Sequence, residues 1–382
     1  MCAMMLLVPA LGVPNEELLQ DTLKSILVCF FALGTALVFF WHARTFNKSV
    51  SLHAVIALPL LLTTYSLASM NWSHAYLAGV EAIRWFIFTL IVFLGANTFT
   101  HNRLTHLSWG IHLGAVIASL WAALQFWFDF SFFAQGPNPA STFVNRNFFG
   151  EFLVCTLPFS VLLLTRMRDK VTVFFLTFSV AFNVVALMQT GTRSALIGSV
   201  ILLAILPACL YRGKQQIYSG AWRLSQGLGL VLVFCSTLVL LGSIPTNNPS
   251  LLRESPDRTA IDRAIGRVAS IAKQTEYTEG SFSVRAVMWI ATAKMIQAYP
   301  IAGVGAGAWE VHIPIYQPPE SQLETDYYAH NEFLQLVAEY GLIGGAFLVL
   351  LLGYLVWAAC ETWFNRTKNG QEETLLRALT LT

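Results

Sequence analysis

The sequence contains long, uninterrupted runs of apolar residues, and these runs constrain its fold more than any other feature. A membrane-spanning helix needs about 20 such residues, and about nine runs approach or exceed that length. Lipid offers the backbone no hydrogen-bond partners, so spanning segments must be helices or closed barrels, and these runs lack the alternation of barrel strands. The sequence therefore predicts an all-α polytopic membrane bundle, with spans near residues 25–43, 51–70, 79–97, 107–128, 148–165, 171–189, 194–211, 226–244 and 341–362.

The composition agrees with a membrane protein and argues against several other classes. Only 12% of the residues are charged, against about 25% in soluble domains. The formal net charge of +2 gives no field that would attract nucleic acid. We expect no cofactor and no metal, because the carboxylates predicted on the outer face form no tight ligand cluster. The cysteines have no CxxC spacing and predict neither a zinc site nor a structural disulfide.

The distribution of Lys and Arg among the loops predicts the orientation. Basic residues gather in loops such as 44–48, 166–170 and 212–223, whereas loop 71–78 has none. Because basic loops stay cytoplasmic, the N-terminus and the long polar insert at 245–340 are predicted to lie outside. We therefore expect one membrane domain over residues 1–382, with a partly helical periplasmic loop at 245–340 before the last span.

Both ends of the chain predict that it is a piece of a longer protein. Residues 1–13 are apolar but too short to span, and they indicate a shortened helix or an interfacial segment. Residues 375–382 resemble the start of a further element.

Two arginines, Arg146 and Arg193, lie on the side that the basic loops otherwise leave empty. Both can be explained by snorkelling at a helix end. Arg193, however, follows a tight polar turn that can aim its guanidinium at the membrane surface. Asn145 and Asn147 flank Arg146 and either donate to a sugar or phosphate or cap the following helix.

The insert contains two predicted helices and a glycine-rich turn. Residues 258–274 have an apolar stripe and a basic opposite face, which predicts a helix that lies on the outer leaflet surface or packs on the membrane body. Residues 283–298 form a second helix, with Arg285 near the edge of its apolar face. In the turn that follows, Gly305 and its neighbouring glycines allow a close approach to a ligand or to a neighbouring helix.

The insert ends on a helix over 330–340 that is predicted to open at His330 and to continue through Gly341 into the last span. His330 acts either as a general base, since a helix N-terminus favours the neutral imidazole, or as a helix cap. Tyr328 and Asn331 flank it as candidate binding residues. The histidines of the first half flank the spans and predict interfacial positions: His42, His53, His74, His101, His106 and His112.

These residues favour a site for a lipid-linked diphosphate sugar. Arginine pairs phosphate oxygens in a bidentate way and never loses its proton, which makes Arg193, Arg285 and then Arg146 the candidates for the diphosphate. His330 would take the proton of an acceptor hydroxyl. The sequence has no HExxH, P-loop or Ser/His/Asp hydrolase pattern.

Five motifs together resemble the O-antigen ligase and O-antigen polymerase superfamily over roughly residues 140–345. They are residues 143–147 (FVNRN), 190–194 (TGTRS), Arg285 with Trp289, 299–307 (YPIAGVGAG) and 329–344 (AHNEFLQLVAEYGLIG). The resemblance implies a metal-independent, inverting glycosyltransferase of the multi-spanning GT-C type in a bacterial inner membrane. Its donor would be an undecaprenyl-diphosphate-linked glycan, and its catalytic residues would be Arg193, Arg285 and His330.

The resemblance leaves the acceptor open. A lipid A core sugar, the end of another glycan, and a Ser or Thr of a protein all fit, and we expect the ligase reaction. A small-solute transporter and a non-enzymatic scaffold for polysaccharide assembly are rivals from other classes. A transporter would show inverted repeats and ionisable groups in broken midplane helices, neither of which is visible in the sequence.

Overall fold

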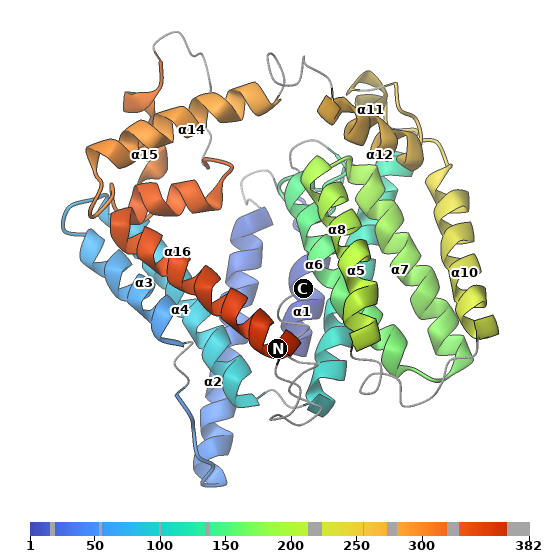
Figure 1. Ribbon diagram of the computed structural model, residues 1–382, viewed down its shortest axis with the longest axis horizontal. Helices are drawn as coiled ribbons and strands as arrows, with labels where there is room; N and C mark the ends of the chain where they lie inside the picture. Colours follow the sequence, from blue (N-terminus) through green and yellow to red (C-terminus); the bar gives the residue numbers. More distant parts are fainter. Residues whose placement is uncertain are drawn as a thin grey trace. The chain divides into compact units, whose positions relative to one another are not determined.

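The computed structural model describes residues 1–15, 20–52, 56–98, 101–133, 138–212, 224–254, 256–272, 281–318 and 328–364, and these residues are helical with no strand (Figure 1). Each predicted apolar run coincides with a helix. Within these described ranges, six helices are long and apolar enough to cross a membrane, and three shorter apolar ones accompany them. The helices are α1 (Cys2–Ala10), α2 (Gln20–Thr45), α3 (Ala57–Ser69), α4 (Ala75–Thr98), α5 (His101–Phe128), α6 (Arg146–Arg166), α7 (Lys170–Thr190), α8 (Arg193–Arg212), α10 (Leu224–Gly242), α11 (Pro249–Glu254), α12 (Ala260–Ala269), the 3-10 turn η2 (Ser270–Ala272), α14 (Ser281–Ala298), α15 (Trp309–Tyr316) and α16 (Glu332–Phe364).

The fold is therefore the predicted polytopic helical membrane protein. The chain forms two compact units. The first contains Met1–Leu33 and Thr100–Ala272, and the second contains Gly34–Phe99 and Lys273–Glu361. The predicted element at 375–382 lies outside the described residues.

The first unit is a bundle of α5, α6, α7, α8 and α10, with α11 and α12 across one end (Figure 1). Its core is built mainly from alanines, such as Ala118, Ala122 and Ala186, with Phe149 and Leu153 between them. Small residues let helix backbones approach closely where lipid supplies no hydrophobic drive between them. The short helix α1 packs along α5 in the same way, because Gly110 leaves room for the backbone carbonyl of Cys2.

His112 does not lie at an interface, contrary to the sequence-based prediction. It is buried in the middle of α5, where its two ring nitrogens each lie 2.9 Å from a serine hydroxyl, of Ser160 on α6 and Ser179 on α7. The prediction failed because it placed histidines only by their distance from the ends of apolar runs. A buried polar ring is tolerated inside a bundle when both of its nitrogens have partners.

The second unit packs α3, α4, α14, α15 and α16 around two buried aromatic residues. Trp309 is fully buried in α15 and donates to Thr292 on α14 at 3.0 Å. Tyr340 on α16 packs against α3 and α4, where its hydroxyl accepts from Trp85 Nε1 at 2.7 Å and lies 3.0 Å from Ser66 Oγ. Buried aromatic residues with a satisfied polar atom fix the register of the helices they join.

Helix α16 does not run continuously through Gly341, as the sequence had predicted. Gly341 has φ 60° and ψ −150°, a conformation that essentially only glycine adopts. The kink frees backbone groups, and the glycine-rich turn takes them up. Leu342 N donates to Pro300 O at 2.8 Å, while Val304 N donates to Ala338 O at 3.0 Å and Gly305 N to Glu339 O at 2.9 Å. The backbone hydrogen-bond groups of the turn and of the kink therefore pair with one another, as buried backbone groups must.

We expect Gly341→Ala to unfold at a lower temperature than the wild-type chain. A methyl group there would lie 2.3 Å from Ile301 O, and the forced backbone conformation alone costs about 1–3 kcal/mol. Gly345→Ala is the matched control on the same helix, since its added carbon would have its nearest neighbour 3.8 Å away. Thermal unfolding of the two purified variants checks the prediction, which is wrong if their midpoints agree.

Candidate functional site

The turn between α7 and α8 is held against the start of α6. Gly191 ends α7 with φ 62°, and Thr192 N donates to Thr190 Oγ1 at 3.1 Å. Thr192 Oγ1 in turn lies 3.2 Å from Asn147 Oδ1 and 3.3 Å from the carbonyl of Arg146. Asn145 caps α6 by accepting from Asn147 N at 2.9 Å. Asn145 is therefore a helix cap, one of the alternatives that the sequence had left open, whereas Asn147 contacts the turn and does not cap.

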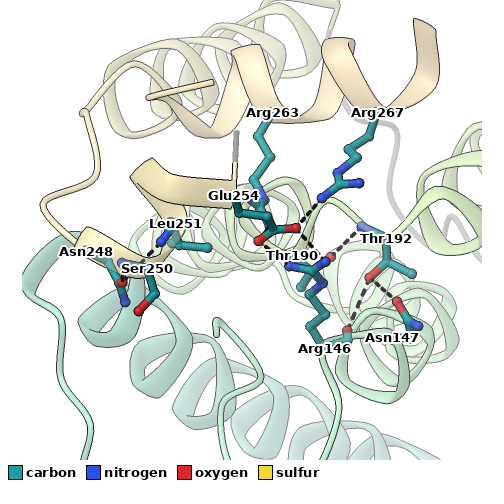
Figure 2. A network of polar contacts seen from close by, with 10 residues as sticks. All are labelled: Arg146, Asn147, Thr190, Thr192, Asn248, Ser250, Leu251, Glu254, Arg263 and Arg267. Atoms are coloured by element: carbon teal, nitrogen blue, oxygen red, sulfur yellow. Dashed lines mark hydrogen bonds and ion pairs between the residues drawn. The ribbon is translucent and has the colours of Figure 1, made fainter. Parts of the chain in front are cut away.

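Arg146 points toward α11 and α12, where three arginines meet one carboxylate (Figure 2). Its two terminal nitrogens bond to the two carboxylate oxygens of Glu254, both at 2.7 Å. From α12, Arg263 Nη2 donates to Glu254 Oε2 at 3.1 Å, and Arg267 Nη2 donates to Oε1. Arg263 and Arg267 are four residues apart and so project from one face of α12. We call these four residues the Arg–Glu254 cluster.

The Arg–Glu254 cluster lies directly on the turn that precedes Arg193. A side-chain carbon at Gly191 would come within 2.8 Å of Arg263 Nε and 3.2 Å of Arg267 Cγ. Gly191 is therefore needed both for its positive φ and for the space that the arginines occupy. Arg193, the first residue of α8, is half-buried two residues further on.

The charges in this cluster are not balanced. Burial raises the pKa of the Glu254 carboxyl, but the hydrogen bonds and charges of Arg146 and Arg263 outweigh that effect and lower it to about 2. Glu254 is thus ionised at neutral pH. The Arg263 side chain is 0% exposed, and its Nε and Nη1 have no hydrogen-bond partner among the described residues. Burial and the neighbouring Arg146 and Arg267 lower the pKa of Arg263, an effect that Glu254 opposes.

Helix α14 in the second unit is joined to the segment that contains His330. Trp289 Nε1 donates to the carbonyl of Ala329 at 3.0 Å, and Ala329 N donates to Gln335 Oε1 at 3.0 Å. Arg285 lies one helical turn before Trp289 and hence on the same face of α14. The structure thereby fastens the helix of Arg285 to the residue adjacent to His330.

His330 itself is exposed and has φ 51°, a left-handed conformation that is uncommon outside glycine. It does not open the helix, contrary to the prediction. Helix α16 starts at Glu332, and Asn331 caps it by accepting from Leu334 N at 3.2 Å. Tyr328 is exposed on the other side of His330. A strained backbone held by surrounding contacts is common at functional sites.

Gly305 has an intramolecular partner instead of an open amide. Its N–H donates to α16, and an added side-chain carbon would lie 2.2 Å from Ser73 Cβ. The prediction that this turn makes a close approach is confirmed, and the approach is to α16 and to the loop between α3 and α4. The part of the chain that the structure describes has no group of three or more His, Cys, Asp or Glu residues that could hold a metal ion.

Residues 178–349 match a protein-family model described as O-antigen ligase. The chain therefore carries an O-antigen ligase domain. No curated protein matches the chain significantly. The O-antigen ligase domain runs from α7 into α16 and contains Arg193, Arg285 and His330, whereas Arg146 and its flanking asparagines precede it. The chain is thus a multi-pass membrane protein that carries a domain of the O-antigen ligase type.

Sequence reasoning missed Glu254, Arg263 and Arg267 of this domain. The basic face of α12 was recognised, but it was expected to lie at a surface, and nothing in the spacing pointed to Glu254 as its partner. The useful signal was the pair of arginines at i and i+4 with an acidic residue shortly before the helix. The apolar side of α12 instead faces outward, with Ile265 64% exposed and Val268 47% exposed.

Proposed function

We propose that the O-antigen ligase domain transfers a glycan from an undecaprenyl-diphosphate carrier to an acceptor hydroxyl at the periplasmic face of a bacterial inner membrane. The observation that supports this most directly is the Trp289–Ala329 hydrogen bond, which ties the helix of Arg285 to the strained segment of His330. A cation for a diphosphate and an imidazole for a hydroxyl proton are the two groups that such a transfer needs.

In this reaction the acceptor hydroxyl attacks the anomeric carbon of the glycan while the bond from that carbon to the diphosphate oxygen breaks. His330 takes the proton of the hydroxyl, and the electron pair of the broken bond leaves with undecaprenyl diphosphate. Arg193 and Arg285 stabilise the charge on the leaving diphosphate, which arginines can do without a metal ion. A single displacement inverts the configuration at the anomeric carbon.

The proposed acceptor is a sugar of the lipid A core, which makes the reaction a ligation. Transfer to the end of another glycan, or to a Ser or Thr of a protein, would use the same donor site and the same base. Tyr328 and Asn331 border His330 and are proposed to lie near the acceptor. Gly305 and its turn hold α16, the helix that follows these residues.

The test uses the purified full chain, a lipid-linked glycan donor and the three kinds of acceptor in separate reactions. We expect glycan transfer to the lipid A core, inversion at the new bond, and full activity in the presence of a chelator. Transfer only to a glycan end or only to a protein would replace the ligase assignment by one of its alternatives. No transfer to any acceptor, together with solute uptake in vesicles that contain the chain, would overturn the proposal in favour of a transporter.

A further inference from the structure

The Arg–Glu254 cluster has more hydrogen-bond donors and positive charge than its carboxylate can satisfy. A carboxylate presents two oxygens, whereas each of the three guanidinium groups carries five N–H donors. Arg263 is the extreme case, since it is fully buried and its Nε and Nη1 lack a partner among the described residues. The carboxylate of Asp257 lies against Gly266 of α12. Even when this carboxylate is counted, the cluster keeps a surplus of positive charge.

The free-energy cost of burying these unpaired donors would fall if a ligand with more acceptor oxygens replaced the Glu254 carboxylate. A buried donor without a partner is expensive, and the cost is greater for a charged group. A phosphate or diphosphate has at least three acceptor oxygens and about two negative charges, and arginine pairs with it in a bidentate way. Glu254, at 28% side-chain exposure, Arg267 at 25% and Arg146 at 18% can all be reached from outside.

We infer that Arg146, Arg263 and Arg267 form a phosphate-binding site in which Glu254 occupies the position of the anion until the ligand arrives. Glu254 is the residue that moves, because it ends the short helix α11, whereas Arg263 is fixed against Gly191. The site adjoins the turn that leads into Arg193. Its ligand, in a step that rests on the proposed function, is the diphosphate of the lipid-linked donor.

Two interpretations of the cluster lead to different expectations. In one, the ion pairs are purely structural; in the other, Glu254 is a placeholder that occupies an anion-binding site. In both cases Glu254→Gln removes a shared counter-ion from three arginines and lowers the unfolding temperature. Only an anion site would let added anion restore the stability, and only a placeholder would bind anion more tightly once its charge is gone. Both quantities can be measured without an acceptor or any transfer reaction.

The experiment measures inorganic pyrophosphate binding to the purified full chain by calorimetry and by thermal unfolding. We expect Glu254→Gln to bind pyrophosphate about tenfold more tightly than the wild-type chain, the change that loss of one competing ion pair would produce. Pyrophosphate should also return its unfolding temperature to the wild-type value. Adding Arg263→Lys to Glu254→Gln should abolish the gain, because a lysine cannot make the bidentate pair.

Two further variants keep the test decisive. Arg267→Gln changes a partly exposed residue of the Arg–Glu254 cluster, so this variant is expected to fold normally. It should bind pyrophosphate about tenfold more weakly than the wild-type chain. Arg253→Gln is the matched control, one position from Glu254 on the exposed side of α11, and should change nothing. The inference is overturned if pyrophosphate fails to stabilise Glu254→Gln, or if Arg253→Gln weakens binding as much as Arg267→Gln does.

A second arm distinguishes the donor diphosphate from an ordinary lipid headgroup. The Glu254→Gln variant is placed in nanodiscs of phosphatidylcholine with or without phosphatidylglycerol. Stabilisation by phosphatidylglycerol but not by pyrophosphate would overturn the assignment to a diphosphate. Failure of pyrophosphate to bind would leave the glycosyl transfer proposal standing, because the transfer assay is separate.

Discussion

The His330→Ala variant is expected to turn over the lipid-linked donor about 10²–10⁴-fold more slowly than the wild-type chain. A general base contributes a factor of this size because it takes up the hydroxyl proton as the new bond forms. The measurement is the initial rate of glycan transfer at saturating donor, with expression and elution volume recorded for each variant. Wild-type rates in this variant would remove His330 from the mechanism.

Two controls separate the imidazole from the unusual backbone at position 330. Asparagine tolerates the left-handed conformation observed there at φ 51°, so His330→Asn keeps the backbone and loses the base. We expect it to be as slow as His330→Ala. If it is fast, the position matters for its conformation and not for its imidazole. His312→Ala, on α15, should retain activity because His312 belongs to no part of the proposed mechanism.

The Arg193→Lys variant is expected to lose at least about tenfold in kcat/KM for the donor, although the charge is kept. A lysine is a point charge on a flexible stem and cannot replace the two parallel hydrogen bonds of a guanidinium to a diphosphate. The loss should appear with every acceptor, since Arg193 is proposed to contact the donor. Rate measurements over a range of donor concentrations test this prediction.

The matched control is Arg168→Lys, which makes the same change in the loop at the other end of α7 from Arg193. We expect it to keep wild-type kinetics. Equal effects of the two substitutions would show that the arginine at position 193 contributes only to membrane orientation or to general electrostatics. Full activity of Arg193→Lys would show that a single positive charge suffices.

The helical membrane fold could be predicted from the sequence because apolar run length is a local property. The apolar face of the helix over 283–298 was predicted for the same reason, and Met288, Ala291 and Met295 on that face are buried in α14. The kink at Gly341 could not be predicted, because it depends on hydrogen bonds that the backbone N–H groups of Val304 and Gly305 donate from a distant part of the chain.

The candidate site shows the same division between local and distant information. Arg193 stands out in the sequence because it breaks the charge pattern of the loops. Glu254 and Arg263 were missed, because their significance comes from a contact that only the packing of α12 against α7 and α8 creates. The meeting of Arg193 with Arg285 and His330 stays a prediction of the sequence.

The shared backbone bonds at the Gly341 kink have a mechanical consequence. Bending α16 at Gly341 would separate residues that the 300–307 segment holds together. Leu342, beyond the kink, donates to Pro300, whereas Ala338 and Glu339, before the kink, accept from Val304 and Gly305. Gly307 N adds a further bond before the kink, to the Glu339 side chain at 2.9 Å. The first turns of α16, which follow His330, are therefore fastened to this segment on both sides of the kink. Any movement of α16 must therefore carry the 300–307 segment with it as one piece instead of bending the helix at Gly341.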